Sequence, residues 1–358
     1  MSETSSSKKV AFLMGAGLSA SAELPASVAL ANRFKARIQT IADGSRAPVL
    51  LKNLFYYLEG GIRLQRAKRG LDPSSDVNIE DIAIAARRLH DRETNALAPF
   101  ISGWHPHLLQ MLLQEASLLD QFLDALFDHL EEDLRTPAAE KIAFMDRLAD
   151  ICQDNGGLDV FTLNYDLCIE KALESTHNFQ VIDGFDSSGW NPKLFKQDGH
   201  SVLRLYKLHG SLNWINSPVM GLVSLAHLDT EAATELFGMR PHLVFGTDVK
   251  LSGQQPFFSL AHLFFEALCC VDLLVVVGYG FGDEYVNALI DQSMRSNRRL
   301  RLLVVSRTAD ELAVQHDQLL GSNRRVRLVK AEARPILENH GLKCLIKKTL
   351  ESAEGDPF

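Results

Sequence analysis

Residues 10–21 read VAFLMGAGLSAS. The first five are apolar, glycines follow at Gly15 and Gly17, and an alanine-rich segment with the pattern of a helix comes next. This order is typical of a strand, a tight turn and a helix start. Backbone N–H groups at such a turn can hold a pyrophosphate, and glycines let the backbone approach it. Ala20 replaces the third glycine of the full phosphate-binding pattern, so a plain strand-to-helix turn is an equal alternative.

Further apolar strand-like segments follow residue 150 and alternate with helical ones. Continuous apolar strands between helices predict a parallel sheet that is covered on both faces, as in Rossmann-like α/β folds. The strongest of these segments are LDVFTLNY (158–165), SVLRLYKLHGSL (201–212), DLLVVVGYGF (272–281) and LRLLVVSRT (300–308).

The domain organisation follows from where the strand pattern stops. Residues 28–149 repeat their apolar positions every three to four residues with almost no strand signal, which predicts an inserted, mostly helical subdomain. We expect residues 9–27 and 150–358 to form the Rossmann-like domain, and the polar, serine-rich residues 1–8 to form a flexible tail.

Composition excludes several classes of protein. The chain has 358 residues and a formal net charge of −8, which disfavours a nucleic-acid partner. Its apolar runs are too short for a membrane span, and no signal peptide is evident, so we expect a cytoplasmic protein. The odd number of cysteines and the absence of a CxxC pair favour neither a disulfide framework nor a metal site: Cys152, Cys168, Cys269, Cys270 and Cys344.

Polar side chains follow the ends of two predicted strands. Asn164 and Asp166 come directly after the apolar run 158–163, and ligands of doubly wound sheets bind at the carboxyl ends of strands. An N-cap role for Asp166 on the next helix is an equal alternative. His209 ends another strand, and the imidazole pKa suits proton transfer near neutral pH. Twelve histidines are present, and any one is more often structural than catalytic.

The strand at residues 273–277 leads into a glycine-rich turn. Three glycines within five residues, beginning at Gly278, suggest close approach of the backbone to a ligand. Tyr279 lies in this turn, and Asp283 stands where a helix N-cap is expected. A tight strand-to-helix turn without a ligand is again an equal alternative.

Taken in order, four segments resemble the successive motifs of the sirtuin superfamily, and specifically its divergent bacterial branch in anti-phage defence: GAGLSASAELP (15–25), FTLNYD (161–166), YKLHGS (206–211) and VVVGYGFGDEYV (275–286). The resemblance implies an NAD⁺ domain in which each motif has a role. Asn164 would hold the nicotinamide ribose and the attacking water together with Asp166, and His209 would be the catalytic histidine. The resemblance further implies that the phosphates and nicotinamide side are lined by Gly15, Ala16, Gly17 and Ser19, that Gly278, Tyr279 and Asp283 border the ribose or pyrophosphate, and that Ser306 contacts the adenosine ribose.

Departures from the deacylating sirtuins indicate a different reaction. The chain has Leu-Asn-Tyr-Asp at 163–166 in place of their Gln-Asn-Ile-Asp, and it lacks both their Asp-Phe-Arg segment and their four-cysteine zinc module. We therefore expect an NAD⁺ hydrolase that uses NAD⁺ as substrate, needs no metal, and releases nicotinamide and ADP-ribose. Two alternatives remain: a protein deacylase or ADP-ribosyltransferase, and a non-catalytic NAD⁺-binding scaffold.

The expected NAD⁺ hydrolysis implies that the activity of the protein is regulated. Constitutive NAD⁺ hydrolysis would poison the host cell, so an NAD-depleting effector of abortive infection needs regulation. We expect a homo-oligomer, and the resemblance suggests a HerA-type ATPase or another defence-system protein as partner.

Overall fold

The computed structural model describes residues 9–40, 47–94, 106–236, 238–245 and 255–351. The chain divides into two compact units, one formed by Met1–Leu24 with Arg135–Phe358 and the other by Pro25–Leu134. The tail expected at residues 1–8 lies outside the described residues.

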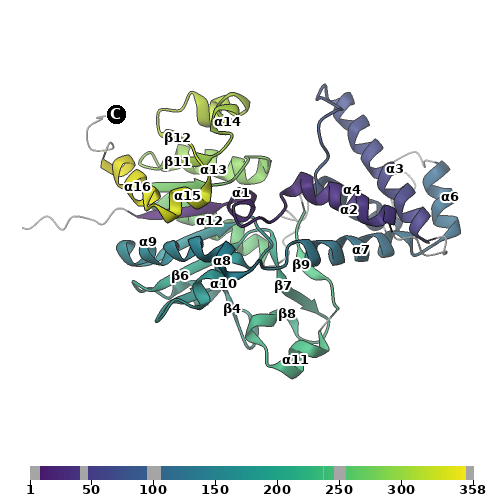
Figure 1. Ribbon diagram of the computed structural model, residues 1–358, viewed down its shortest axis with the longest axis horizontal. Coiled ribbons are helices and arrows are strands. Elements are labelled where there is room, and N and C mark those ends of the chain that lie inside the picture. The colour runs from purple at the N-terminus through teal and green to yellow at the C-terminus, as the bar shows by residue number, and fades with distance from the viewer. Residues whose placement is uncertain (1–8, 41–46, 95–105, 237, 246–254, 352–358) are drawn as a thin grey trace, which may run out of the picture. The chain divides into compact units, whose positions relative to one another are not determined.

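A seven-stranded parallel sheet is the centre of the larger unit (Figure 1). Every neighbouring pair of its strands is parallel. Strand β1 is central: the chain continues on one side of it with β2, and it returns on the other side with β10. In spatial order the strands are β12 (Val326–Lys330), β11 (Arg301–Ser306), β10 (Leu273–Val277), β1 (Val10–Met14), β2 (Leu158–Thr162), β6 (Val202–Lys207) and β3 (Gln180–Ile182).

Helices cover both faces of this sheet, and the alternation of side chains along β1 shows why. Phe12 and Met14 belong to one core and Ala11 and Leu13 to the other, and all four are fully buried. The predicted α/β, Rossmann-like fold class is confirmed. The first core includes residues of α1 (Ala16–Ala20), α8 (Ala139–Ile142), η1 (Ala143–Asp146), α9 (Arg147–Asn155), α10 (Cys168–Glu174), α15 (Ala333–Glu338) and α16 (Gly341–Glu351); the second includes residues of α12 (Phe257–Cys270), α13 (Glu284–Ser296), α14 (Ala309–Gln315) and η4 (Asp317–Gly321).

Small antiparallel elements follow β3 and β6 in the chain. Ile215 of the longest of these strands packs with Val223 and Leu236 in a small apolar cluster, whereas Trp214 of the same strand belongs to the second core of the main sheet. The elements are β4 (Phe185–Asp186) paired with β5 (Gly189–Trp190), η2 (Pro192–Lys196), the three-stranded sheet of β8 (Gly221–Ser224), β7 (Gly210–Ser217) and β9 (Pro241–Leu243), η3 (Leu225–His227) and α11 (Thr230–Glu235).

The smaller unit is helical in its described residues. Phe34 lies at its centre, where its ring packs edge-on against Phe55 and Phe122 at centroid distances of 6.0 and 5.4 Å. Its helices are α2 (Ser27–Thr40), α3 (Ala47–Lys68), α4 (Ile79–Thr94), α6 (Pro106–Gln114) and α7 (Leu118–Asp133).

The second boundary of this unit differs from the expected one. Residues 135–149 were expected in the helical subdomain, but they belong to the larger unit, where Ile142, Phe144 and Leu148 pack into its core. The apolar positions of these residues repeat with a helical period in either unit, so the sequence pattern alone could not assign them to one unit.

None of the helices in the described ranges combines the length and low polarity needed to cross a bilayer.

Candidate active site

The loops that follow the parallel strands lie at one edge of the sheet, because parallel strands share their carboxyl ends. Strand β2 lies on one side of β1, and β10 lies on the other side. The order of the strands thus switches between β1 and β10, and ligands of doubly wound folds bind at such a switch point. The predicted site residues come to this edge: Gly15, Ala16, Gly17 and Ser19 after β1, Asn164 and Asp166 after β2, His209 after β6, Gly278, Tyr279 and Asp283 after β10, and Ser306 at the end of β11.

The two glycines after β1 are required for contact between two loops. The Gly15 N–H donates to the Val277 carbonyl at 3.0 Å, and the Gly17 N–H donates to the Gly278 carbonyl at 2.8 Å. A Cβ added to Gly15 would lie 2.6 Å from Cα of Tyr279, and one added to Gly17 would lie 2.7 Å from Cα of Gly278. The packing of backbone on backbone therefore explains these glycines, in addition to the ligand access expected from the sequence.

This packing predicts the effect of a single methyl group. Gly17→Ala should lower the free energy of unfolding by about 1–3 kcal/mol, because its Cβ meets backbone that cannot move without shifting β10. Chemical denaturation followed by circular dichroism measures this change. Gly280→Ala is the matched control, since a Cβ at Gly280 has open space around it. Equal midpoints for both variants would contradict the loop packing.

A directed chain of hydrogen bonds orients the Asn164 side chain. The Asp166 carboxylate accepts the Ser19 hydroxyl proton at 2.7 Å, so the Ser19 oxygen is left to accept. It accepts from Nδ2 of Asn164 at 2.8 Å, and Nδ2 also donates to the Gly15 carbonyl at 3.1 Å. Both amide hydrogens are thus used, which fixes the amide against a flip. Oδ1 of Asn164 accepts no hydrogen bond within the described ranges and remains available to a ligand.

Asp166 has two roles, because its two oxygens face different partners. Oδ2 receives Ser19, while Oδ1 accepts the backbone N–H of Cys168 at 3.0 Å at the start of α10. One buried carboxylate therefore accepts at the start of α10, as the capping alternative predicts, and also binds Ser19; its contact with a ligand stays a prediction. Burial, with a smaller effect of Asp166, raises the pKa of the Cys168 thiol well above its ordinary value. Cys168 is therefore a poor nucleophile despite its position.

His209 is paired with Asp283 through a hydrogen bond that defines its tautomer. Its Nε2 lies 2.9 Å from Oδ2 of Asp283, and the carboxylate can only accept, so Nε2 carries the proton. In the neutral ring Nδ1 is then the atom that can take up a proton. Oδ1 of Asp283 caps α13 by accepting from the N–H groups of Tyr285 and Val286 at 2.9 and 3.1 Å. Asp283 thus joins a helix start to the imidazole.

Tyr279 and Ser306 make local contacts. The Tyr279 hydroxyl accepts the Asp283 N–H at 3.1 Å and donates to Oδ1 of Asn287 at 2.9 Å, so it braces the loop after β10. Ser306 binds Thr308, whose N–H it accepts at 3.2 Å. Both side chains therefore shape their loops, whether or not a ligand is bound.

Sequence reasoning missed one pair of charged residues beside the site. Lys207 is only 1% exposed, and its ammonium lies 2.8 Å from the Glu170 carboxylate and 2.5 Å from the Asp166 carbonyl. Burial raises the pKa of the Glu170 carboxyl, and the neighbouring ammonium opposes this rise. A lysine between apolar residues of a buried strand was the sequence signal that could have identified this pair.

In the described part of the chain, no group of three or more His, Cys, Asp or Glu side chains is arranged for a metal ion.

Comparison with known proteins finds one family model that matches part of the chain. Residues 159–329 match the model of the SIR2-like domain, a range that includes Asn164, His209 and Asp283 and begins after the Gly15 turn. No curated protein matches the chain in sequence. Similar solved structures include a Sir2 homologue mutant in complex with ADP-ribose (12% identity, TM-score 0.44, all of both chains covered) and Sir2Tm bound to a propionylated peptide (11% identity, TM-score 0.43, 94% of both chains covered).

Proposed function

We propose, on the premise that this chain is a sirtuin-like protein with a SIR2-like domain, that it cleaves NAD⁺ with water to nicotinamide and ADP-ribose. The observation that carries the proposal is the Asn164 amide, which two hydrogen bonds lock with Oδ1 available to a ligand. His209 follows the neighbouring strand β6 and binds Asp283 at the start of α13, which supports a proton acceptor at the same sheet edge.

The reaction exchanges one bond to the anomeric carbon of the ribose. The bond from that carbon to the nicotinamide nitrogen breaks, its electron pair leaves with nicotinamide, and the ribose passes through an oxocarbenium-like state. Water attacks the same carbon while its hydrogen bond to Oδ1 of Asn164 orients it. The buried Nδ1 of His209 accepts the proton of the water, and the proton is released to solvent when the products leave. Asp283 stabilises the imidazolium formed in this step.

The remaining site residues are proposed to bind the rest of the dinucleotide. The N–H groups of Gly15 and Gly17 already donate within the protein, so we assign the pyrophosphate to the start of α1 at Ala16. Ser19 holds Asn164 on the nicotinamide side. Gly278 and Tyr279 border the ribose or pyrophosphate, and Ser306 contacts the adenosine ribose.

Product analysis tests the reaction. The purified protein is incubated with NAD⁺, and also with NAD⁺ and an acetylated peptide, and the products are separated by chromatography and identified by mass. Free nicotinamide and ADP-ribose in equal amounts without peptide support hydrolysis. Release of nicotinamide only with the peptide, together with an acetylated ADP-ribose, means deacylation. Saturable binding of NAD⁺ that stays intact means a binding module.

We also propose that assembly controls this activity in an anti-phage system. The protein would act as a homo-oligomer, with a HerA-type ATPase as partner, so that NAD⁺ is depleted only on infection. Light scattering coupled to size-exclusion chromatography, with NAD⁺ turnover measured on each fraction, tests this. A monomer with full activity alone contradicts it.

A further inference from the structure

Lys207 lies at a depth where an ammonium must have partners. It ends β6, its side chain is 1% exposed, and its neighbours Tyr206 and Leu208 are also buried. A charge in such surroundings is unfavourable unless it is paired and hydrogen-bonded. The three N–H bonds of the ammonium have three acceptors: the Asp166 carbonyl at 2.5 Å, the Glu170 carboxylate at 2.8 Å and the Tyr165 carbonyl at 3.5 Å.

The two carbonyls belong to the segment that carries the candidate site. They follow Asn164 directly in the chain, and Asp166 binds Ser19 through its side chain while it accepts Lys207 through its backbone. The amino end of this segment is held separately, since the Leu163 N–H donates to the Met14 carbonyl at 3.0 Å. Lys207 therefore fixes the other end of the same short segment.

We propose that Lys207 is a positioning residue, whose ammonium, neutralised by Glu170, holds the segment 163–166 so that Asn164 and Asp166 keep their catalytic orientation. This proposal rests on the proposed NAD⁺ hydrolysis for its kinetic test, and on the loop geometry for its structural test. Lys207 itself makes no contact with substrate in this scheme and acts through the backbone of Asp166.

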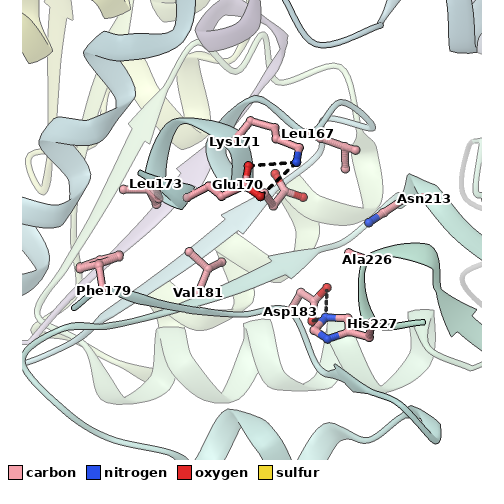
Figure 2. Close-up of a pocket in the computed structure, with 11 residues that line it drawn as sticks. Leu167, Glu170, Lys171, Leu173, Phe179, Val181, Asp183, Asn213, Ala226 and His227 are labelled. Atoms are coloured by element: carbon pink, nitrogen blue, oxygen red, sulfur yellow. Dashed lines mark hydrogen bonds and ion pairs between the residues drawn. The ribbon is translucent and has the colours of Figure 1, made fainter. Parts of the chain in front are cut away.

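A cavity borders the Glu170 side of this ion pair. Figure 2 shows Glu170 among the residues that line this cavity. The cavity has a volume of about 360 Å³, and its lining residues come mainly from α10, β3 and η3. Lys171 binds Glu174 in this cavity at 2.9 Å, and His227 binds Asp183 at 2.9 Å. Because Glu170 lines the cavity and binds Lys207, we expect truncation of the lysine to open a path by which a small amine in the cavity reaches Glu170.

Substitution and chemical rescue test the proposal together. Lys207→Ala should lower kcat for NAD⁺ by about 100-fold with a smaller change in KM, because misplacement of catalytic groups acts mainly on the chemical step. Ethylamine should restore part of this kcat, whereas ethanol should not, since only the ammonium can bind Glu170 and the carbonyls together. Lys171→Ala removes a half-exposed lysine that lies next to Glu170 on α10 and lines the same cavity as Glu170; it is the control and should keep the parent kcat.

A second variant and a crystal structure keep the proposal testable if Lys207→Ala folds poorly. Glu170→Gln preserves shape but leaves the ammonium without its counter-charge, and it should also lower kcat. In crystals of either variant the Asn164–Ser19 hydrogen bond, 2.8 Å in the parent, should be broken or lengthened. An unmoved segment 163–166 overturns the positioning role whatever the substrate is. A parent protein that leaves NAD⁺ intact overturns only the proposed function.

Discussion

Asn164→Ala should lower kcat for NAD⁺ cleavage by about 100- to 1000-fold, the usual effect of removing one pre-oriented polar group that acts in the transition state. The fold should persist, because the side chain is only partly buried and lies after the end of β2. The loss has a defined cause: Oδ1 is the atom of the amide that the Ser19 and Gly15 contacts leave available for the attacking water. Nicotinamide release under saturating NAD⁺ measures it.

Two further variants sharpen this test. Asn213→Ala removes an amide that is partly buried like that of Asn164 but binds Ser224 in the small antiparallel sheet. This variant should turn over NAD⁺ at the parent rate. Ser19→Ala keeps Asn164 but removes the acceptor that orients it, so an intermediate loss is expected. Parent activity in Asn164→Ala, with the control equally active, would remove Asn164 from the mechanism.

His209→Gln should lower kcat by about 100- to 10,000-fold, the range expected when a general base is lost. The glutamine amide can still donate to Asp283, which preserves the cap of α13, but it cannot accept a proton at neutral pH. This variant therefore separates proton transfer from support of the loop. His209→Ala should be at least as inactive, and it also leaves the Asp283 carboxylate without its imidazole.

The readouts for His209 are turnover and binding in the same sample. NAD⁺ affinity, measured by calorimetry on the inactive protein, should change far less than kcat if the imidazole acts mainly in the chemical step. His242→Gln is the histidine control, since its ring stacks on Phe257 at a centroid distance of 5.0 Å. A His209→Gln protein that retains more than a tenth of the parent kcat would contradict the role of His209 as a general base.

The sequence alone determined the layers of the fold. Apolar runs such as 273–277 exceed what a half-exposed strand tolerates, so a sheet covered on both faces was the consistent solution. The strand ends also identified Asn164 and His209 as candidates, because polar residues that directly follow buried strands lie at one edge of a parallel sheet. Both inferences use local patterns of residues, which a chain displays before it folds.

Only the tertiary structure decided which of these residues lie in contact. Asp283 binds His209 across 74 positions of the chain, and Ser19 binds Asp166 across 147 positions. No local sequence pattern could therefore predict either pair. The glycines after β1 likewise proved to be needed against the backbone after β10, a contact that exists only once the two strands are neighbours. Lys207 is a charge that the pattern of a buried strand disfavours, and its reason is the set of acceptors that folding brings around it. Hydrogen bonds between distant segments depend on strand order, and strand order is set by the packing of the whole sheet.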